Sequence, residues 1–88
     1  MRTYTIDKER VSYLPLADVL YIGYGEHALD CCDALEDVAP GITVMTVNGE
    51  FSGAEIYDFA ATYGGLPARV VVNGSNPFVL DIPSVPIG

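Results

Sequence analysis

Residues 11–68 contain no lysine and no arginine. The carboxylates of these 58 residues are Asp18, Glu26, Asp30, Asp33, Glu36, Asp37, Glu50, Glu55 and Asp58. Charge of a single sign repels itself and destabilises a compact state, so soluble domains ordinarily intersperse both signs. This pattern constrains the surface that the folded chain presents, and it indicates an origin other than fold stability.

The composition is that of one small globular domain, residues 1–88. Half of the residues are hydrophobic, which is enough for a core despite the net charge of -8. The mean hydropathy of +0.30 is high for so acidic a chain, so some apolar surface is expected to meet a partner or a second copy. A pI near 4.1 argues against direct binding of nucleic acid or anionic lipid, because such binding needs clustered lysine and arginine.

The sequence predicts a cytoplasmic protein. No apolar run approaches the roughly 20 residues of a membrane-spanning helix, and the N-terminus lacks the apolar centre of a signal peptide. The two cysteines, Cys31 and Cys32, are adjacent and form no disulfide framework, which favours a reducing compartment.

Most segments show strand signals, because β-branched and aromatic residues alternate with turn residues. Residues 3–6 and 11–14 are expected to form a hairpin. For residues 18–22 a strand is favoured over a short helix that begins at Pro15. Further strands are predicted over 42–47, 68–72 and 78–82, followed by an extended apolar tail over 83–88.

Two segments show helical periodicity. In residues 26–38, the apolar side chains fall within about 120° of one another, and Pro40-Gly41 is an expected helix stop. In residues 52–63, Ser52 and Glu55 match a capping box and Gly64-Gly65 suits a helix end. The expected fold is therefore α/β, or α+β, of order β(β)βαβαββ. It has a single sheet of 4–6 strands with both amphipathic helices packed on it.

The first helix would carry a regular acidic face. Glu26, Asp30, Asp33 and Asp37 are spaced 4, 3 and 4 residues apart. On a helix these carboxylates climb in steps of about 4.5–6 Å, comparable with the phosphates of a nucleic-acid strand. Either they only solubilise the helix or they bind a partner. The predicted partner-binding residues are Glu26, Asp30, Asp33, Asp37, Glu36, Tyr24, Glu55 and Asp58.

A second motif, Gly23-Tyr24-Gly25, follows a predicted strand and opens a predicted helix, with Glu50 near the end of the next strand. The piece resembles the opening βαβ unit of Rossmann-type folds, which implies nucleotide binding at the helix start. Carboxylates near that start and the absence of bases count against it. His27 and Cys31 lack a second pair of zinc ligands. The sequence predicts no cofactor, no metal and no catalytic residues.

The favoured hypothesis is a small, non-enzymatic acidic protein that docks on a basic, nucleic-acid-handling protein and blocks it. This strategy resembles that of compact acidic inhibitors from phages and mobile elements, including anti-restriction and anti-CRISPR proteins. The alternatives are a structural or self-assembling subunit, such as a homodimer, and a nucleotide-binding βαβ module.

Overall fold

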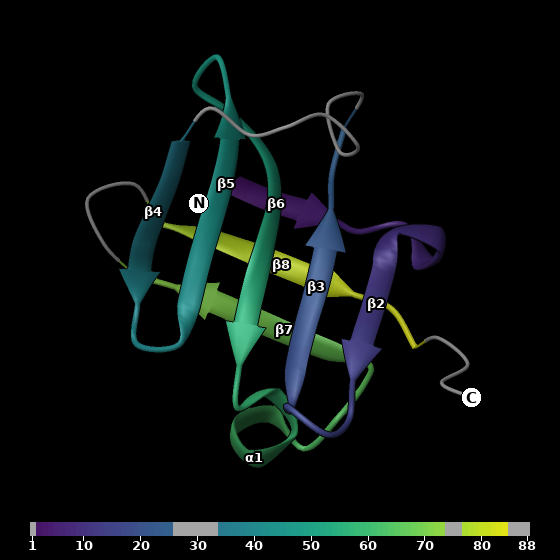
Figure 1. The fold of residues 1–88 in the computed structure, drawn as a ribbon. Helices are drawn as coiled ribbons and strands as arrows, with labels where there is room; N and C mark the ends of the chain where they lie inside the picture. The colour runs from purple at the N-terminus through teal and green to yellow at the C-terminus, as the bar shows by residue number, and fades with distance from the viewer. Residues whose placement is uncertain (1, 26–33, 74–76, 85–88) are drawn as a thin grey trace.

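The computed structural model describes residues 2–25, 34–73 and 77–84, which fold into two β-sheets. The strands are β1 (Arg2–Thr5), β2 (Val11–Leu14), β3 (Val19–Gly23), β4 (Ala34–Ala39), β5 (Ile42–Val47), β6 (Glu50–Tyr57), β7 (Ala68–Val72) and β8 (Phe78–Ile82). A short turn of 3-10 helix, η1 (Lys8–Arg10), precedes β2, and one α-helix, α1 (Phe59–Tyr63), follows β6. The larger sheet has the order β2-β3-β6-β5-β4, and the smaller β1-β8-β7. In Figure 1 the strands of the smaller sheet run across those of the larger one, behind it.

The larger sheet is antiparallel throughout its described pairs, and short turns set its register. Pro40 and Gly41 connect β4 to β5, and Gly41 has a φ of 78°, as the third position of a type II turn requires. Asn48 and Gly49 connect β5 to β6 with φ angles of 52° and 80°, which fits the type I′ turn favoured in two-residue hairpins.

The core lies between the two sheets and follows from strand alternation. On β6, Ala54 and Ile56 are buried, whereas Glu55 and Tyr57 lie on the opposite face. Most of the buried apolar side chains form one cluster: Ile6, Leu20, Ile22, Ile42, Val44, Ala54, Ile56, Phe59, Val70, Val72, Leu80 and Ile82.

The predicted fold class is wrong, because neither long helix forms among the described residues. Residues 34–38 of the first predicted helix belong to β4, and residues 52–57 of the second belong to β6. Pro40-Gly41 makes a hairpin turn instead of ending a helix. Short apolar runs satisfy helical and strand periods alike, and pairing with distant strands decides between them.

Several strands are confirmed. β5, β7 and β8 have the predicted bounds, and β3 matches the predicted strand over 18–22 to within a residue, so the helix from Pro15 is wrong. β7 and β8 pair antiparallel as predicted. The predicted hairpin of residues 3–6 with 11–14 is wrong, because β1 pairs with β8 in parallel while β2 pairs with β3.

Helix α1 is shorter than predicted and is capped by a distant residue. It ends at Gly64, as expected, but begins only after Asp58, and its first amides bind Asp18. Ser52 is no helix cap, because its buried hydroxyl donates to the carbonyl oxygen of Met45 at 3.2 Å. In the part of the chain that the structure describes, no helix is long and apolar enough to span a membrane.

Candidate functional site

The structure scatters the predicted binding residues over different elements. Glu26, Asp30 and Asp33 lie outside the described residues. Glu36 and Asp37 are consecutive residues of β4, the outermost strand of the larger sheet, so they do not belong to a helical acidic face. Glu55 lies on β6, and Asp58 is at the exposed turn before α1.

Asp37 and Glu55 share one row of the larger sheet. Thr43 on β5 pairs with Asp37 on one side and with Glu55 on the other, so the three side chains project from the same face. The smaller sheet covers the opposite face, on which Ala54 and Ile56 are buried. The row is therefore open to a partner.

Neutral hydroxyl groups donate hydrogen bonds to these two carboxylates. The Thr43 hydroxyl donates to Asp37 Oδ1 at 2.7 Å, and the Tyr57 hydroxyl donates to Glu55 Oε2 at 2.8 Å. The hydrogen bond to Glu55, together with the negative charge of that carboxylate, raises the pKa of Tyr57. Within the described chain no lysine or arginine forms an ion pair with Asp37 or Glu55.

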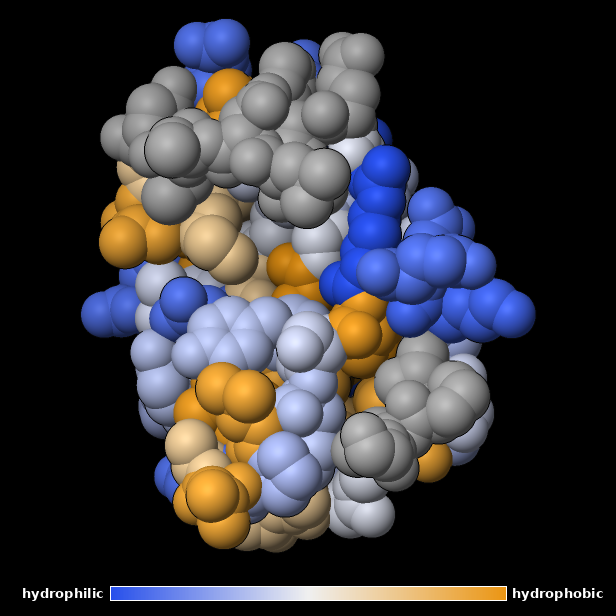
Figure 2. Space-filling view, turned by 45° about the vertical axis from the view of Figure 1, so that its right-hand side comes forward, coloured by the Kyte–Doolittle hydropathy of each residue, from blue (hydrophilic) through white to orange (hydrophobic). Residues whose placement is uncertain are grey.

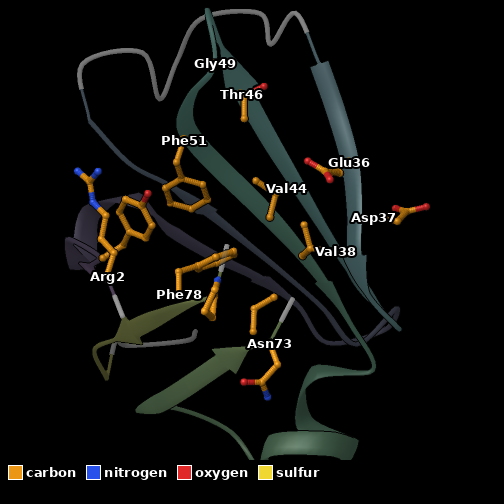
Figure 3. Close-up of a pocket in the computed structure, with 13 residues that line it drawn as sticks. Arg2, Glu36, Asp37, Val38, Val44, Thr46, Gly49, Phe51, Asn73 and Phe78 are labelled. Carbon is orange, nitrogen blue, oxygen red and sulfur yellow. The ribbon is translucent and has the colours of Figure 1, made fainter. Parts of the chain in front are cut away.

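Glu36 faces the other way from Asp37. Its partner on β5 is Val44, a core residue, which places Glu36 on the inner face of the sheet. In Figure 3 the Glu36 carboxylate is turned toward a pocket between the sheets, whereas the Asp37 carboxylate is turned away from it. No described residue donates a hydrogen bond to Glu36. We call Asp37 and Glu55 on the outer face, together with Glu36 on the inner face of the edge strand, the acidic patch.

The pocket beside Glu36 has a volume of about 710 Å³. Val38 and Val44 line it on the side of the larger sheet, and Phe78 on the side of the smaller one (Figure 3). Val72 of β7 also lines it. Thr46 and Asn73 add polar groups. Pockets of this size and mixed lining hold small molecules or single side chains in many proteins.

An aromatic cluster closes one end of this pocket. The ring of Tyr4 lies 4.5 Å from that of Phe51 and 5.8 Å from that of Phe78, measured between centroids. Tyr24 packs edge-on against Tyr4 at 4.9 Å, so it lies in this cluster. The Arg2 guanidinium lies 4.9 Å from the centre of the Tyr4 ring, a cation–π contact.

Exposed apolar side chains lie beside the acidic patch and at the opposite edge of the larger sheet. Leu35 precedes Glu36 on β4 and is 63% exposed, and Tyr57 follows Glu55 on the outer face and is 44% exposed. Leu14 and Leu16 are exposed at the turn between β2 and β3. Figure 2 shows apolar patches separated by hydrophilic ones on the side of the molecule that it presents.

The described residues do not assemble the other sites weighed from sequence. The described strand that follows Gly23-Tyr24-Gly25 is β4. The antiparallel pairs β3–β6, β6–β5 and β5–β4 make β4 run opposite to β3, so this motif does not open a βαβ unit, which requires parallel strands. No group of three histidine, cysteine or carboxylate side chains in the described ranges could hold a metal ion. His27, Cys31 and Cys32 lie outside those ranges.

Comparison with family models, with curated proteins and with solved structures finds no match to this chain. The site therefore has to be interpreted from its own geometry.

Sequence reasoning missed the residues that complete the site. The sequence pattern does not single out Thr43 or Tyr57. Tyr57 is two residues from Glu55, and Thr43 lies across the β4–β5 hairpin turn from Asp37, so each becomes the neighbour of its acid once these segments are strands. The pocket residues Tyr4, Phe51 and Phe78 come from three distant segments, and no local pattern could unite them.

Proposed function

We propose that this chain is a small, non-enzymatic acidic protein that docks on the basic surface of a nucleic-acid-handling protein and blocks it. The observation that supports this is the acidic patch. Glu36, Asp37 and Glu55 lie on β4 and β6 of one sheet, and strands β2 to β6 contain no base. Nearby Leu35 and Tyr57 offer apolar surface that a partner could desolvate.

The charge acts mainly on encounter and on orientation. Complementary potentials raise association rates and set register, while buried apolar and aromatic groups carry much of the affinity. A protein that binds nucleic acid offers lysine and arginine to phosphates, so an acidic surface competes for the same groups. The spacing differs from that of a helix: Asp37 and Glu55 are two strand positions apart, about 10 Å.

The test uses a partner identified by affinity capture from the native host and then purified. The variant D37N/E55Q removes two charges but keeps an oxygen to accept from Thr43 and from Tyr57. We expect it to weaken binding at low ionic strength and to reduce the salt dependence of the dissociation constant. An oligonucleotide bound by the partner should displace the wild-type chain.

The matched control is D7N/D81N, which changes the net charge equally on exposed residues away from the acidic patch. This control should bind nearly as the wild type does. Equal binding by D37N/E55Q and D7N/D81N would show that the acidic patch is not the docking surface. Simultaneous binding of the oligonucleotide and the chain would rule out blocking.

Self-association is a second candidate, favoured by the apolar turn between β2 and β3. Leu16 is fully exposed there and Leu14 is 47% exposed. Exposed leucines on a small protein are candidates for a contact between identical subunits. The acidic patch does not suit such a contact, because a symmetric dimer would place its carboxylates against one another.

A further inference from the structure

Strand β4 leaves one side of its backbone unpaired by any described strand. It is the last strand of the larger sheet and bonds only to β5 (Figure 1). An edge strand exposes alternate N–H and C=O groups, which can pair with another extended chain. Its six residues are long enough to pair with a short segment of a partner.

The two faces of this edge differ in what they offer. On the inner face Glu36 and Val38 border the pocket, and on the outer face Leu35 and Asp37 are exposed. A strand added to β4 would send alternate side chains to these two faces. One side chain would then enter the pocket beside Glu36, and the next would lie beside Asp37.

The pocket suits a long cationic side chain. Lysine and arginine combine an apolar stem with a charged end. Val38, Val44 and Phe78 could hold the stem. Glu36 supplies a negative charge at the edge of the pocket, away from Arg2, which packs on Tyr4.

The charges also indicate which occupant fits. Two β4 edges from identical chains would bring Glu36 and Asp37 of one copy against those of the other, and facing like charges destabilise strand pairs. A basic segment reverses the sign of that interaction. The absence of lysine and arginine from residues 11–68 leaves this edge without bases of its own.

We propose that β4 takes up an extended basic segment of the partner protein as a sixth strand. Two consecutive basic residues of that segment lie opposite Glu36 and Asp37, and the first places its side chain in the pocket between the sheets. This inference rests on the proposed function, because it specifies how the acidic patch meets a basic partner.

The test uses a synthetic peptide, acetyl-Thr-Val-Lys-Lys-Val-Thr-amide, and the intact chain at low ionic strength. Binding is followed by the amide NMR signals of residues 34–39, whose hydrogen exchange should slow when the peptide pairs with β4. Two N-methylated peptides carry the methyl groups on alternate residues, in opposite frames. Since alternate N–H groups of a strand point to opposite sides, one frame should abolish binding and the other should preserve it.

Chain variants test the side-chain contacts. E36Q and D37N should each weaken peptide binding about two- to fivefold, the range expected for one cross-strand charge pair. T46F should fill the pocket with a side chain that strands accommodate well. It should therefore strongly weaken binding of the lysine-containing peptide. D81N is the control and should change nothing, and thermal melting verifies that each variant is folded.

The outcomes separate this inference from the proposed function. If both N-methylated peptides bind equally, the peptide acts only as a polycation, and strand addition is wrong while docking by charge stands. If the peptide fails to bind although the purified partner does, strand addition is also wrong. If neither binds, the proposed function fails as well. If the chain alone forms a dimer in which the β4 amides are protected from exchange, the strand that pairs with β4 comes from a second copy of this chain. The proposal of a basic partner segment would then be wrong.

Discussion

At the scale of single residues, Asp18 does the most to join separate parts of the fold. Its φ is 53°, and its carboxylate accepts hydrogen bonds from the Tyr13 hydroxyl at 2.7 Å and from the amides of Ala60 and Ala61 at 2.7 and 3.2 Å. Its carbonyl oxygen accepts from the Phe59 amide at 3.1 Å. These amides begin α1 and have no partner within the helix. One aspartate therefore attaches the helix to the turn between β2 and β3.

These bonds make the stability of the protein depend on pH. The hydrogen bond from Tyr13, and then that from Ala60, lowers the pKa of Asp18 below its ordinary value of 3.8. The unfolded state then takes up the proton more readily than the folded state. The stabilisation from ionised Asp18 is therefore present above about pH 3.8, and it is lost as the pH falls through the lower pKa of the folded state.

We expect D18N to melt at a lower temperature than the wild type at pH 7, because the amide can accept fewer of these hydrogen bonds. The difference should shrink as the pH falls below 3.8, where the wild type also loses the ionised carboxylate. Circular dichroism melts between pH 2 and 7 measure this, with D81N as the control. Equal melting temperatures at pH 7 would contradict the assignment of Asp18 as the helix cap.

At the scale of elements, the close packing of β6 between β3 and β5 requires a glycine at residue 53. Gly53 faces Gly23 on β3 and Met45 on β5. A Cβ atom at Gly53 would lie 2.6 Å from the carbonyl oxygen of Ile22 and 3.0 Å from Met45 Cε. A side chain there would push the central strands apart. The prediction of a helix over residues 52–63 could not anticipate this contact, because it brings together residues from three separate strands.

The variant G53A tests this requirement. We expect it to lower the free energy of unfolding by about 1–3 kcal/mol, the usual cost of inserting atoms into a packed site. Urea unfolding measures the change. S12A, on the exposed face of β2, is the control and should change the free energy by less than about 0.5 kcal/mol. A G53A variant as stable as the wild type would show that the strands separate easily at this point.

At the scale of the whole molecule, the net charge of -8 opposes contact between copies, while exposed leucines favour it. We expect sedimentation velocity to report a monomer at micromolar concentration, because charge of one sign keeps such proteins apart. A dimer that dissociates on L16S, but not on the control L35S, would instead favour the self-assembling subunit and would place its contact at the turn between β2 and β3.

Residue order by itself determined the surface charge and most places where the chain turns. Pro40-Gly41 and Gly64-Gly65 interrupt elements as predicted, and Asn48-Gly49 makes the turn between β5 and β6, because turn geometry depends on local backbone chemistry. Strands β5, β7 and β8 were predictable for a similar reason, since β-branched residues fill them between such turns.

Only the tertiary structure decided that residues 34–39 and 50–57 are strands, and with them the geometry of the acidic patch. A strand is stabilised by hydrogen bonds to other strands, so its existence depends on what lies beside it. Glu36 and Asp37, adjacent in sequence, consequently lie on opposite faces, and Asp37 and Glu55 share a row across Thr43. The pocket has the same origin, because two sheets had to meet before Tyr4, Phe51 and Phe78 could surround one space.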